Sequence, residues 1–444
     1  AYVPAENGIK RLRDGELGPD GQIPEFPYDP SQKYFSGGGG LCSTATDYMW
    51  FCQMLLNGGE LNNVRLLKKE TVKLMASNQI GTMPTPGLDA PFGFGFTIFP
   101  DEKDVHPQLR DAYAWSGYWS TSFRISPRGD WIIVTMSQVG WDEGATQEQF
   151  AKYERIAAES IKENDLPAAK PQDVGVSPEK VEVLSTYMQS LVDDGKIAGG
   201  VTMFARRGKV VHLKAVGMAD IETGTEMKPD AIFRLASMSK AILTVGTMKL
   251  HEQGRLCLDD PVSEFIPEFK NMKVHVNADS SKSKPANTPI TIHHLLTHTS
   301  GLASCFDETV GPIYTAHGIE AGISTIQMDL RQTVKTLAGL PLLSEPGAKW
   351  ESGISSEVLG RVIEVASGMR LDRFLKDHVC APLGMTDTFF NVPADKTPRL
   401  ASAYIPVDTC IRKVKHGEKM RQEFQGMLVP ISSDYCYGNT NQFL

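Results

Sequence analysis

The sequence predicts an α+β protein, in which an antiparallel β-sheet flanked by helices lies beside an all-helical part. Three observations favour this class. Strand-like apolar patterns over residues 113–119, 122–126 and 131–137, with a turn before the last, indicate an antiparallel meander. A hairpin is expected over residues 200–217, where two apolar runs flank Arg207-Gly208. Apolar residues at helical spacing precede and follow these strands, which is typical of α+β folds.

The start of the chain predicts loops followed by a capped helix. Residues 1–36 are rich in Pro, Gly and Asp, and we expect loops there. The glycine run Gly37–Gly40 then leads to Ser43 or Thr44, either of which could cap a helix that ends at Gly58-Gly59. A glycine run directly before a capped helix favours a turn with close backbone approach over a flexible linker.

The same patterns place the remaining elements. A second helix is expected over residues 68–76 and a strand over residues 92–99, where apolar residues alternate with glycine. Residues 165–173 contain two prolines and are expected to form a linker. Further helices are expected to begin near Ser237 and to cover residues 147–164, 177–194, 291–302 and 354–366.

Composition excludes several classes of function. The chain has 444 residues, of which 41% are hydrophobic and 22% charged, as is usual for a globular protein. The net charge of −8 and the lack of a basic stripe argue against a nucleic-acid partner. No apolar run reaches the roughly 18 residues that a membrane-spanning helix requires, so no membrane association is expected.

The seven cysteines are scattered and odd in number, and none forms a Cys-x-x-Cys pair. Reduced, buried thiols and a cytoplasmic location are therefore expected. The polar residues 1–7 lack the apolar core of a signal peptide. No metal site is expected, because His293, His294 and His298 lie close together without the cysteine or carboxylate pattern that would complete a zinc site.

A candidate nucleophile lies at the start of one predicted helix. Ser237 and Lys240 are three positions apart, so on a helix they share one face. A serine hydroxyl needs a base within hydrogen-bonding distance, and a lysine can serve if its pKa is lowered. Ser-x-x-Lys is the arrangement of penicillin-binding proteins and serine β-lactamases. Alone it proves little, because Ser239 and Lys240 could equally cap a helix and face solvent.

Several further segments extend this motif. They are Phe233-Arg-Leu-Ala-Ser-Met-Ser-Lys240, Leu295-Leu-Thr-His-Thr-Ser-Gly-Leu302, Pro346-Gly-Ala-Lys-Trp350, Val358-Leu-Gly-Arg-Val-Ile-Glu364, Pro382-Leu-Gly-Met-Thr386, Gly38-Gly-Gly-Leu-Cys-Ser-Thr-Ala-Thr-Asp47 and Trp115-Ser-Gly117. Together they make the chain resemble the class C β-lactamase-like serine hydrolases, namely the family VIII carboxylesterases and related acyltransferases, with penicillin-binding proteins more distant. The resemblance implies a β-lactamase/penicillin-binding-protein-like fold.

The order of these segments departs from the family. In relatives the Gly-Gly-Leu helix and the Trp-x-Gly strand follow the Ser-x-x-Lys half, whereas here residues 1–164 precede it. The chain is therefore expected to be circularly permuted. In addition, residues 1–16 align without gaps to residues 403–418, with six of sixteen positions identical. The chain thus resembles a window cut from two related copies arranged head to tail. Whether one chain closes its own site, or two chains form a homo-oligomer or exchange segments, stays open.

These considerations divide the chain into six parts. They are residues 1–84, a loop and helical segment of the helical domain; 85–164, the C-terminal strands and helix of the α/β domain; 165–173, the linker; 174–275, the N-terminal part of the α/β domain with Ser-x-x-Lys; 276–405, the helical domain; and 406–444, a partial repeat and divergent tail.

The resemblance implies roles for individual residues. Ser237 would be the nucleophile that forms an acyl-enzyme, and Lys240 its proton acceptor. Relatives place a tyrosine two positions after the residue that matches Trp350, as a partner base. Here that position is Ser352, whose hydroxyl is shorter and less acidic than a phenol. The departure leaves open an impaired enzyme, or a lineage in which catalysis is lost or rerouted through Tyr118, Tyr314 or a water.

The strand that carries Trp115-Ser-Gly117 lies, in relatives, at the edge of the site. β-Lactamases have a lysine where this chain has Trp115, so neutral esters are favoured over substrates with a carboxylate. The resemblance also implies an oxyanion hole formed by the backbone N–H groups of Ser237 and Tyr118. His298 is expected to pack or cap within its helix turn rather than to take part in catalysis.

The function expected from the sequence is therefore a serine hydrolase or acyl transferase of small carboxylic esters. Neither a Gly-x-Ser-x-Gly elbow nor a nucleotide-binding motif occurs, so an α/β-hydrolase is excluded and no cofactor is expected. The alternatives are a β-lactamase or D-Ala-D-Ala peptidase and, because of Ser352, a non-catalytic binding protein.

Overall fold

The structure is a computed structural model, and the residues it describes fall into several ranges. These are residues 2–5, 8–11, 34–88, 90–101, 107–140, 152–153, 156–157, 171–276, 282–319, 328–407, 410–413, 420–424 and 427–431. Most of the helix predicted over residues 147–164 and most of the linker at 165–173 lie outside them.

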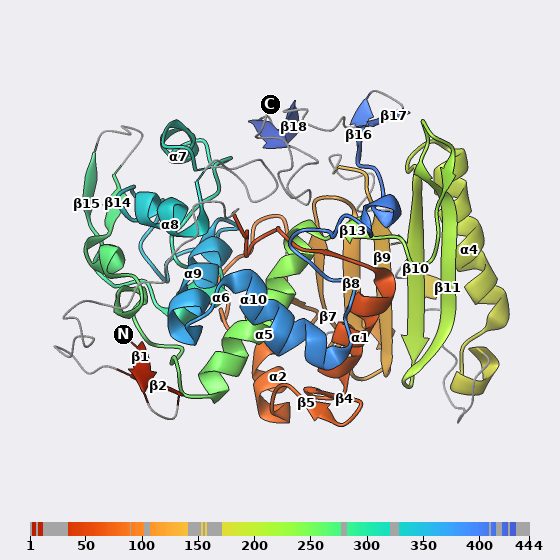
Figure 1. Ribbon diagram of the computed structural model, residues 1–444, viewed down its shortest axis with the longest axis horizontal. Coiled ribbons are helices and arrows are strands. Elements are labelled where there is room, and N and C mark those ends of the chain that lie inside the picture. Colours follow the sequence, from red (N-terminus) through yellow and green to blue (C-terminus); the bar gives the residue numbers. More distant parts are fainter. Residues whose placement is uncertain are drawn as a thin grey trace.

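A seven-stranded antiparallel sheet is the largest element of the fold (Figure 1). Its strand order is β12-β11-β10-β9-β8-β7-β6. The strands are β6 (Thr97–Ile98), β7 (Tyr113–Gly117), β8 (Thr121–Ser126), β9 (Trp131–Ser137), β10 (Gly199–Arg206), β11 (Lys209–Asp220) and β12 (Thr225–Glu226). β9 pairs with β10 from Trp131↔Arg206 to Ser137↔Gly200. Residues on both sides of the linker therefore build one sheet, and the predicted meander and hairpin are confirmed.

Helices cover both faces of this sheet because the side chains of β9 alternate between them. Ile132 and Val134 are buried in the larger core, which also contains residues of α1 (Ala45–Leu56). Trp131 and Ile133 belong to the smaller core under α4 (Pro178–Asp193). α1 packs against β8, β9 and β10. It therefore lies with the sheet, whereas the sequence analysis grouped residues 1–84 with the helical domain.

The helical part is arranged around α9 (Ser355–Ser367). Helices α5, α6, α8 and α10 each pack against it. The helices here are α5 (Ser239–Glu252), α6 (Ile292–Leu296), α7 (Gly311–Ala316), α8 (Leu330–Ala338) and α10 (Leu371–Leu375). Because α9 contacts so many neighbours, nearly all of its residues are buried, including Glu357, Arg361 and Glu364.

Short elements complete the described part of the chain. They are the helix α2 (Lys69–Met75) and the strand pairs β1 (Tyr2–Ala5) with β2 (Gly8–Arg11), β3 (Cys42–Ser43) with β13 (Phe233–Arg234), β4 (Glu60–Leu61) with β5 (Val64–Arg65), β14 (Lys273–His275) with β15 (Ser283–Pro285), β16 (Tyr404–Val407) with β17 (Cys410–Lys413), and β18 (Met420–Phe424) with β19 (Met427–Ile431). The β3–β13 pair matters most for the site, since it joins the segment before α1 to the segment before α5.

Two predicted elements are largely wrong. Of the strand predicted over residues 92–99, only Thr97–Ile98 pairs with the sheet, because Gly95 is left-handed (φ 76°) and Gly93 N–H donates to the Phe96 carbonyl within a turn. Of the helix predicted over residues 291–302, only Ile292–Leu296 forms. His298 has a left-handed φ of 57°, which a continuing helix cannot accommodate.

The expectation that all cysteines are reduced is also wrong. Cys42 is disulfide-bonded, whereas Cys52 and Cys380 carry free thiols. Sequence spacing could not reveal this bond, because the fold decides which cysteines meet. None of the helices in the described part of the chain combines the length and apolar character needed to cross a membrane.

Candidate active site

Ser237 lies in a strained turn that leads directly into α5. A single 3₁₀ turn, Ala236–Met238, precedes the first residue of α5. Ala236 has a left-handed φ of 47°, which is uncommon for a residue with a Cβ and is often found at functional sites. The Tyr48 hydroxyl of α1 donates to the Met238 carbonyl at 2.9 Å and helps to hold the turn. Ser237 is half-buried, while both of its neighbours are fully buried.

Lys240 is the base nearest to this hydroxyl. Its Nζ lies 2.8 Å from Ser237 Oγ and donates a second hydrogen bond, also of 2.8 Å, to the Gly38 carbonyl. Burial lowers the pKa of Lys240 to about 8, while the nearby Glu357 carboxylate acts in the opposite direction. At pH 7 roughly a tenth of the amines would then be neutral, enough for Lys240 to act as a proton acceptor. The structure therefore brings these two predicted residues together.

The glycine run forms a bridge between Lys240 and Glu357. Glu357 accepts hydrogen bonds from Ser36 Oγ (2.6 Å) and from the backbone N–H groups of Gly37 (3.0 Å) and Gly38 (3.3 Å). A Cβ added to Gly38 would lie 2.8 Å from Glu357 Oε1, which is closer than real Cβ atoms approach. The close-approach turn predicted for the glycine run is present.

Sequence reasoning missed the part played by Glu357. Burial raises the pKa of its carboxyl, whereas the hydrogen bonds from Ser36 and the charge of Lys240 oppose this. Glu357 lies on α9, five positions after Ser352, and its sequence context is that of an ordinary helix residue. Only the tertiary approach of Ser36 and the glycine run shows that its carboxylate faces the site.

The end of β7 lies directly beside the Ser237 turn. A Cβ on Gly117 would be 2.1 Å from the Leu235 carbonyl oxygen, so only glycine fits. Thr121 Oγ1 donates to the same carbonyl at 2.9 Å. The segment that carries Trp115, Gly117 and Tyr118 is thus held against the Ser237 turn, within one chain. The oxyanion hole formed by Tyr118 and Ser237 N–H groups stays a prediction.

An aromatic cluster connects Trp115 to Trp350. Phe92 is at its centre, with ring centroids 5.4 Å from Trp115, 5.5 Å from Trp350 and 5.6 Å from His298. Burial and the charge of Lys240 lower the pKa of His298 to about 3, so its imidazole is neutral at pH 7. His298 packs in this cluster, as its sequence context predicted.

Ser352 is exposed, and within the described structure no hydrogen bond joins it to Ser237 or Lys240. The Tyr314 hydroxyl donates to the Pro341 carbonyl at 3.0 Å, so its proton is already engaged. Burial raises the pKa of Tyr118 well above its usual value. The hydrogen bond of Tyr314 therefore does not place its hydroxyl in the role that the phenol has in relatives.

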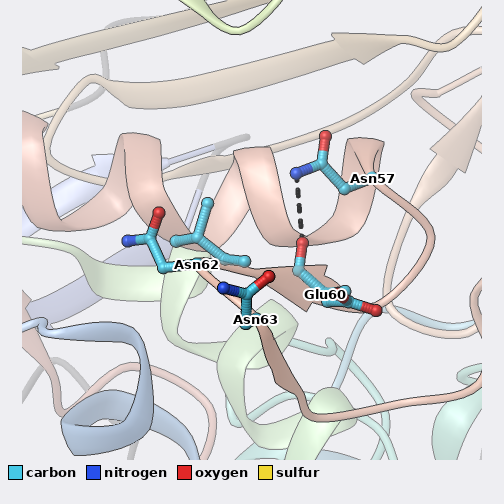
Figure 2. A pocket seen from close by; sticks show the side chains of 5 residues that line it. Asn57, Glu60, Asn62 and Asn63 are labelled. Atoms are coloured by element: carbon cyan, nitrogen blue, oxygen red, sulfur yellow. Dashed lines mark hydrogen bonds between the residues drawn. The ribbon is translucent and has the colours of Figure 1, made fainter.

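A polar hollow elsewhere on the surface has no catalytic character (Figure 2). Asn57, Glu60, Leu61, Asn62 and Asn63 line it, and Asn57 Nδ2 donates to the Glu60 carbonyl at 3.1 Å. It lies at the C-terminal end of α1, about 18 Å along the helix from the end that follows the glycine run. Its lining residues include no serine, cysteine, histidine or lysine.

The β-lactamase family matches this chain over residues 1–152 and 184–421. The chain therefore belongs to this family, which confirms the β-lactamase-like α+β fold and the resemblance expected from the sequence, whereas the circular permutation stays a prediction.

Among curated relatives, Esterase EstB of Burkholderia gladioli is 37% identical over 207 residues, which cover 47% of this chain and 50% of that protein. Acyltransferase mokF of Monascus pilosus is 28% identical over 258 residues, covering 55% and 60%. Among solved structures, EstCE1, described as a hydrolase with promiscuous acyltransferase activity, aligns with a TM-score of 0.50 at 31% identity, covering 56% of this chain and 63% of that one. The chain spans about half the length of the curated relatives it matches.

Proposed function

We propose that this chain is a serine hydrolase or acyl transferase that acts on small carboxylic esters through an acyl-enzyme on Ser237. One observation carries the proposal: the buried Lys240 amine lies 2.8 Å from Ser237 Oγ and has a pKa of about 8. A hydroxyl with a partly neutral amine in hydrogen-bonding contact is the minimal nucleophile–base pair. The esterase and acyltransferase names of the relatives support the same class of reaction.

In the proposed acylation, Lys240 takes the proton of the Ser237 hydroxyl while Oγ bonds to the ester carbonyl carbon. The carbonyl oxygen becomes an oxyanion, which the backbone N–H groups of Ser237 and Tyr118 would stabilise. The intermediate then collapses, the bond to the alkoxy oxygen breaks, and the leaving alkoxide takes the proton from Lys240. Water or a second alcohol releases the acyl group by the reverse sequence, losing its proton to Lys240 and restoring the Ser237 hydroxyl.

Neutral esters are the proposed substrates because Trp115, and not a cation, stands on the strand beside the site. A half-buried indole offers no charge to a substrate carboxylate, whereas a lysine there would. With Ser352 in place of the tyrosine, we propose that turnover is impaired, since the second proton-handling group is absent.

A single chain is proposed to be sufficient for the site, in the permuted order. Gly38 and Gly117 come from the segment before the linker, and Ser237 and Lys240 from the segment after it. The hydrogen bond from Lys240 to Gly38 and the close approach of Gly117 to Leu235 support closure within the chain.

The test is a burst experiment with p-nitrophenyl butyrate, followed by intact-mass measurement. The chain should release a burst of nitrophenol and gain one butyryl group on Ser237. The Ser237→Ala variant should lose both. Ser239→Ala is the matched control: it removes a serine of the same motif that accepts from Leu41 N–H, and it should still be acylated. Without burst or mass gain, the chain would be a binding protein. Faster turnover of nitrocefin would favour a β-lactamase.

A further inference from the structure

The repeated segments at the two ends of the chain form the same hairpin. Residues 2–11 pair Tyr2 with Arg11, Pro4 with Ile9 and Ala5 with Gly8. The aligned residues 404–413 pair Tyr404 with Lys413, Pro406 with Ile411 and Val407 with Cys410. Each pair in the first hairpin therefore matches the pair at the aligned positions in the second. The two segments therefore share a hairpin with the same strand register, in addition to their similar sequences.

The second of these hairpins is anchored to the sheet through Tyr404. The Tyr404 backbone donates to the Gln138 carbonyl and accepts from Gly140 N–H, both at 2.7 Å, just beyond β9. The Tyr404 hydroxyl accepts from Ile221 N–H and donates to Glu222 Oε2, both at 2.8 Å. We call the surface formed by residues 138–140 and 221–222 the Tyr404 seat.

Burial makes this seat specific for an aromatic residue with a hydroxyl. Only 1% of Tyr404 is exposed, and its ring belongs to the core under α4, together with Trp131 and Val139. The seat surrounds the ring with apolar side chains and offers the hydroxyl one hydrogen-bond donor and one acceptor. Few side chains other than tyrosine satisfy both conditions. Tyrosine is the residue at the aligned position of the other hairpin, Tyr2.

Among the described strands, the first hairpin does not pair with the seven-stranded sheet. β1 and β2 pair only with each other. In Figure 1 they lie beside the N label at the lower left, whereas β16 and β17 lie at the upper right next to the sheet. The described chain thus has two copies of one hairpin, and the second copy occupies the Tyr404 seat.

Connectivity allows the first hairpin to reach the seat. It precedes the half of the chain that carries residues 138–140, and residues 12–33 connect it to Tyr34. Fully extended, that connection spans up to about 70 Å, more than the width of a domain of this size. Loop closure of this length costs little more than closure of a shorter one.

We propose that residues 2–11 are a second occupant of the Tyr404 seat within the same chain. When residues 404–413 leave the seat, the first hairpin docks there with Tyr2 in the place of Tyr404. The seat is then covered in both arrangements, and the C-terminal segment can detach without exposing the core under α4. This exchange does not depend on the proposed enzymatic activity.

The test is a double-mutant cycle on the full chain, measured by urea unfolding. Tyr2→Ala alone should leave the midpoint unchanged, and Tyr404→Ala should lower it modestly. The double variant should lower it by about twice the shift of Tyr404→Ala, because no tyrosine is left for the seat. Tyr187→Ala, which trims the same core outside the seat, is the control and should show no coupling to Tyr2→Ala.

Two results would overturn the proposal. If the double variant unfolds at the same midpoint as Tyr404→Ala, Tyr2 never occupies the seat. If Tyr404→Ala becomes dimeric by light scattering, and Tyr2→Ala restores the monomer, the hairpin docks on a second copy and not on its own chain. A monomeric Tyr404→Ala variant that keeps slow hydrogen exchange at Gly140 N–H, and loses it on adding Tyr2→Ala, would support docking within the chain.

Discussion

The carbonyl oxygen of Gly38 accepts a hydrogen bond of 2.8 Å from Lys240 Nζ, although the two residues are 202 positions apart. The same glycine donates its N–H to Glu357. One peptide segment therefore fixes the proposed base from one side and a buried carboxylate from the other. The position and the charge state of Lys240 depend on a part of the chain that comes before the linker.

Gly38→Ala should damage both stability and acylation. The new Cβ would lie 2.8 Å from Glu357 Oε1 and 3.7 Å from Lys240 Nζ, so either the Glu357 carboxylate or the glycine segment must shift. Such overpacking costs about 1–3 kcal/mol in a packed interior. Displacement of the Gly38 carbonyl should also misplace Lys240. Urea unfolding and the rate of nitrophenol release in the burst measure the two effects.

Gly339→Ala is the matched control for that variant. Gly339 has φ −84° at the end of α8, and a Cβ there would meet nothing closer than 3.4 Å. It should leave the burst unchanged. Equal burst rates in the wild type and in Gly38→Ala would contradict the positioning role of the glycine segment.

Glu357→Gln should move the acidic limb of the acylation rate to lower pH. Lys240 must be neutral to accept a proton, and the Glu357 charge keeps its pKa higher than burial alone would. Removing that charge lowers the pKa of Lys240, so the amine becomes neutral at a lower pH. At an effective dielectric constant of about 20, one charge about 4 to 10 Å away shifts a pKa by roughly one to three units, and a shift of the acidic limb in this range is expected. Burst rates between pH 5 and 9 measure it.

The control is Glu364→Gln on the same helix. Glu364 is buried and paired with Arg361 at 3.1 Å, and it bonds the Leu371 N–H. Loss of the Glu364 charge should lower the free energy of unfolding. The acidic limb of the acylation rate should stay at the same pH. Dinitrophenylation of Lys240, followed against pH in the Ser237→Ala background, reports the same pKa without requiring any turnover. An unshifted limb in Glu357→Gln would show that its charge does not reach Lys240.

The sequence predicts those parts of the site that are local in the chain. Ser237 and Lys240 stand three positions apart, and helical geometry alone brings them together. Thr44 caps α1 as one of two predicted candidates, accepting from Asp47 N–H. Glu357 could not be found in this way, because the groups that donate hydrogen bonds to its carboxylate, Ser36 Oγ and Gly37 N–H, lie more than 300 positions away.

The failed predictions have the same origin. Alternation of Phe and Gly after Phe92 satisfied the pattern of a strand, but glycines also permit the left-handed turn that the tertiary structure selects. The Cys42 disulfide likewise depends on which segments meet. The spacing of apolar residues predicts which face of one helix or strand is buried. Strand register, turns and disulfides depend on contacts between elements, which this spacing does not show.

The free energy of unfolding should fall as pH rises from about 4 to about 6, because of Asp47. Burial raises the pKa of this carboxyl from its ordinary value to about 6, despite hydrogen bonds from Asp387 N–H and Thr388 Oγ1. In the unfolded chain Asp47 ionises near 4. Between these values only the folded state holds the proton, so a rise in pH favours unfolding, by at most about 3 kcal/mol.

Asp47→Asn tests this assignment. Asparagine keeps a carbonyl oxygen for the two hydrogen bonds and does not ionise. The variant should therefore lose the part of the pH dependence between pH 4 and 6, and at pH 7 it should be at least as stable as the wild type. An identical slope in both proteins, measured by urea unfolding across this range, would assign the dependence to other groups.

Ser352→Tyr should raise turnover more than acylation. Ser352 is exposed and makes no hydrogen bond in the described structure, so the larger side chain creates no overlap in a packed core. A phenol returned to this position could exchange a proton with the leaving group and with the incoming water, and general acid–base catalysis of that kind contributes on the order of a hundredfold or more. The steady-state rate after the burst should rise by about that factor, whereas the burst amplitude should stay at one per chain.

Gln189→Tyr on α4 is the matched control for a tyrosine added to an exposed position away from the site. It should leave both phases unchanged. The comparison also distinguishes an impaired enzyme from a protein that has lost catalysis altogether. A large gain in the steady-state rate of Ser352→Tyr shows that every catalytic group except the phenol is in place. An unchanged rate, with Ser237 still acylated, shows that the surroundings of residue 352 no longer direct a phenol toward Lys240, and that restoring catalysis would require the loop anchored by Glu351 N–H to the His298 carbonyl to be rebuilt.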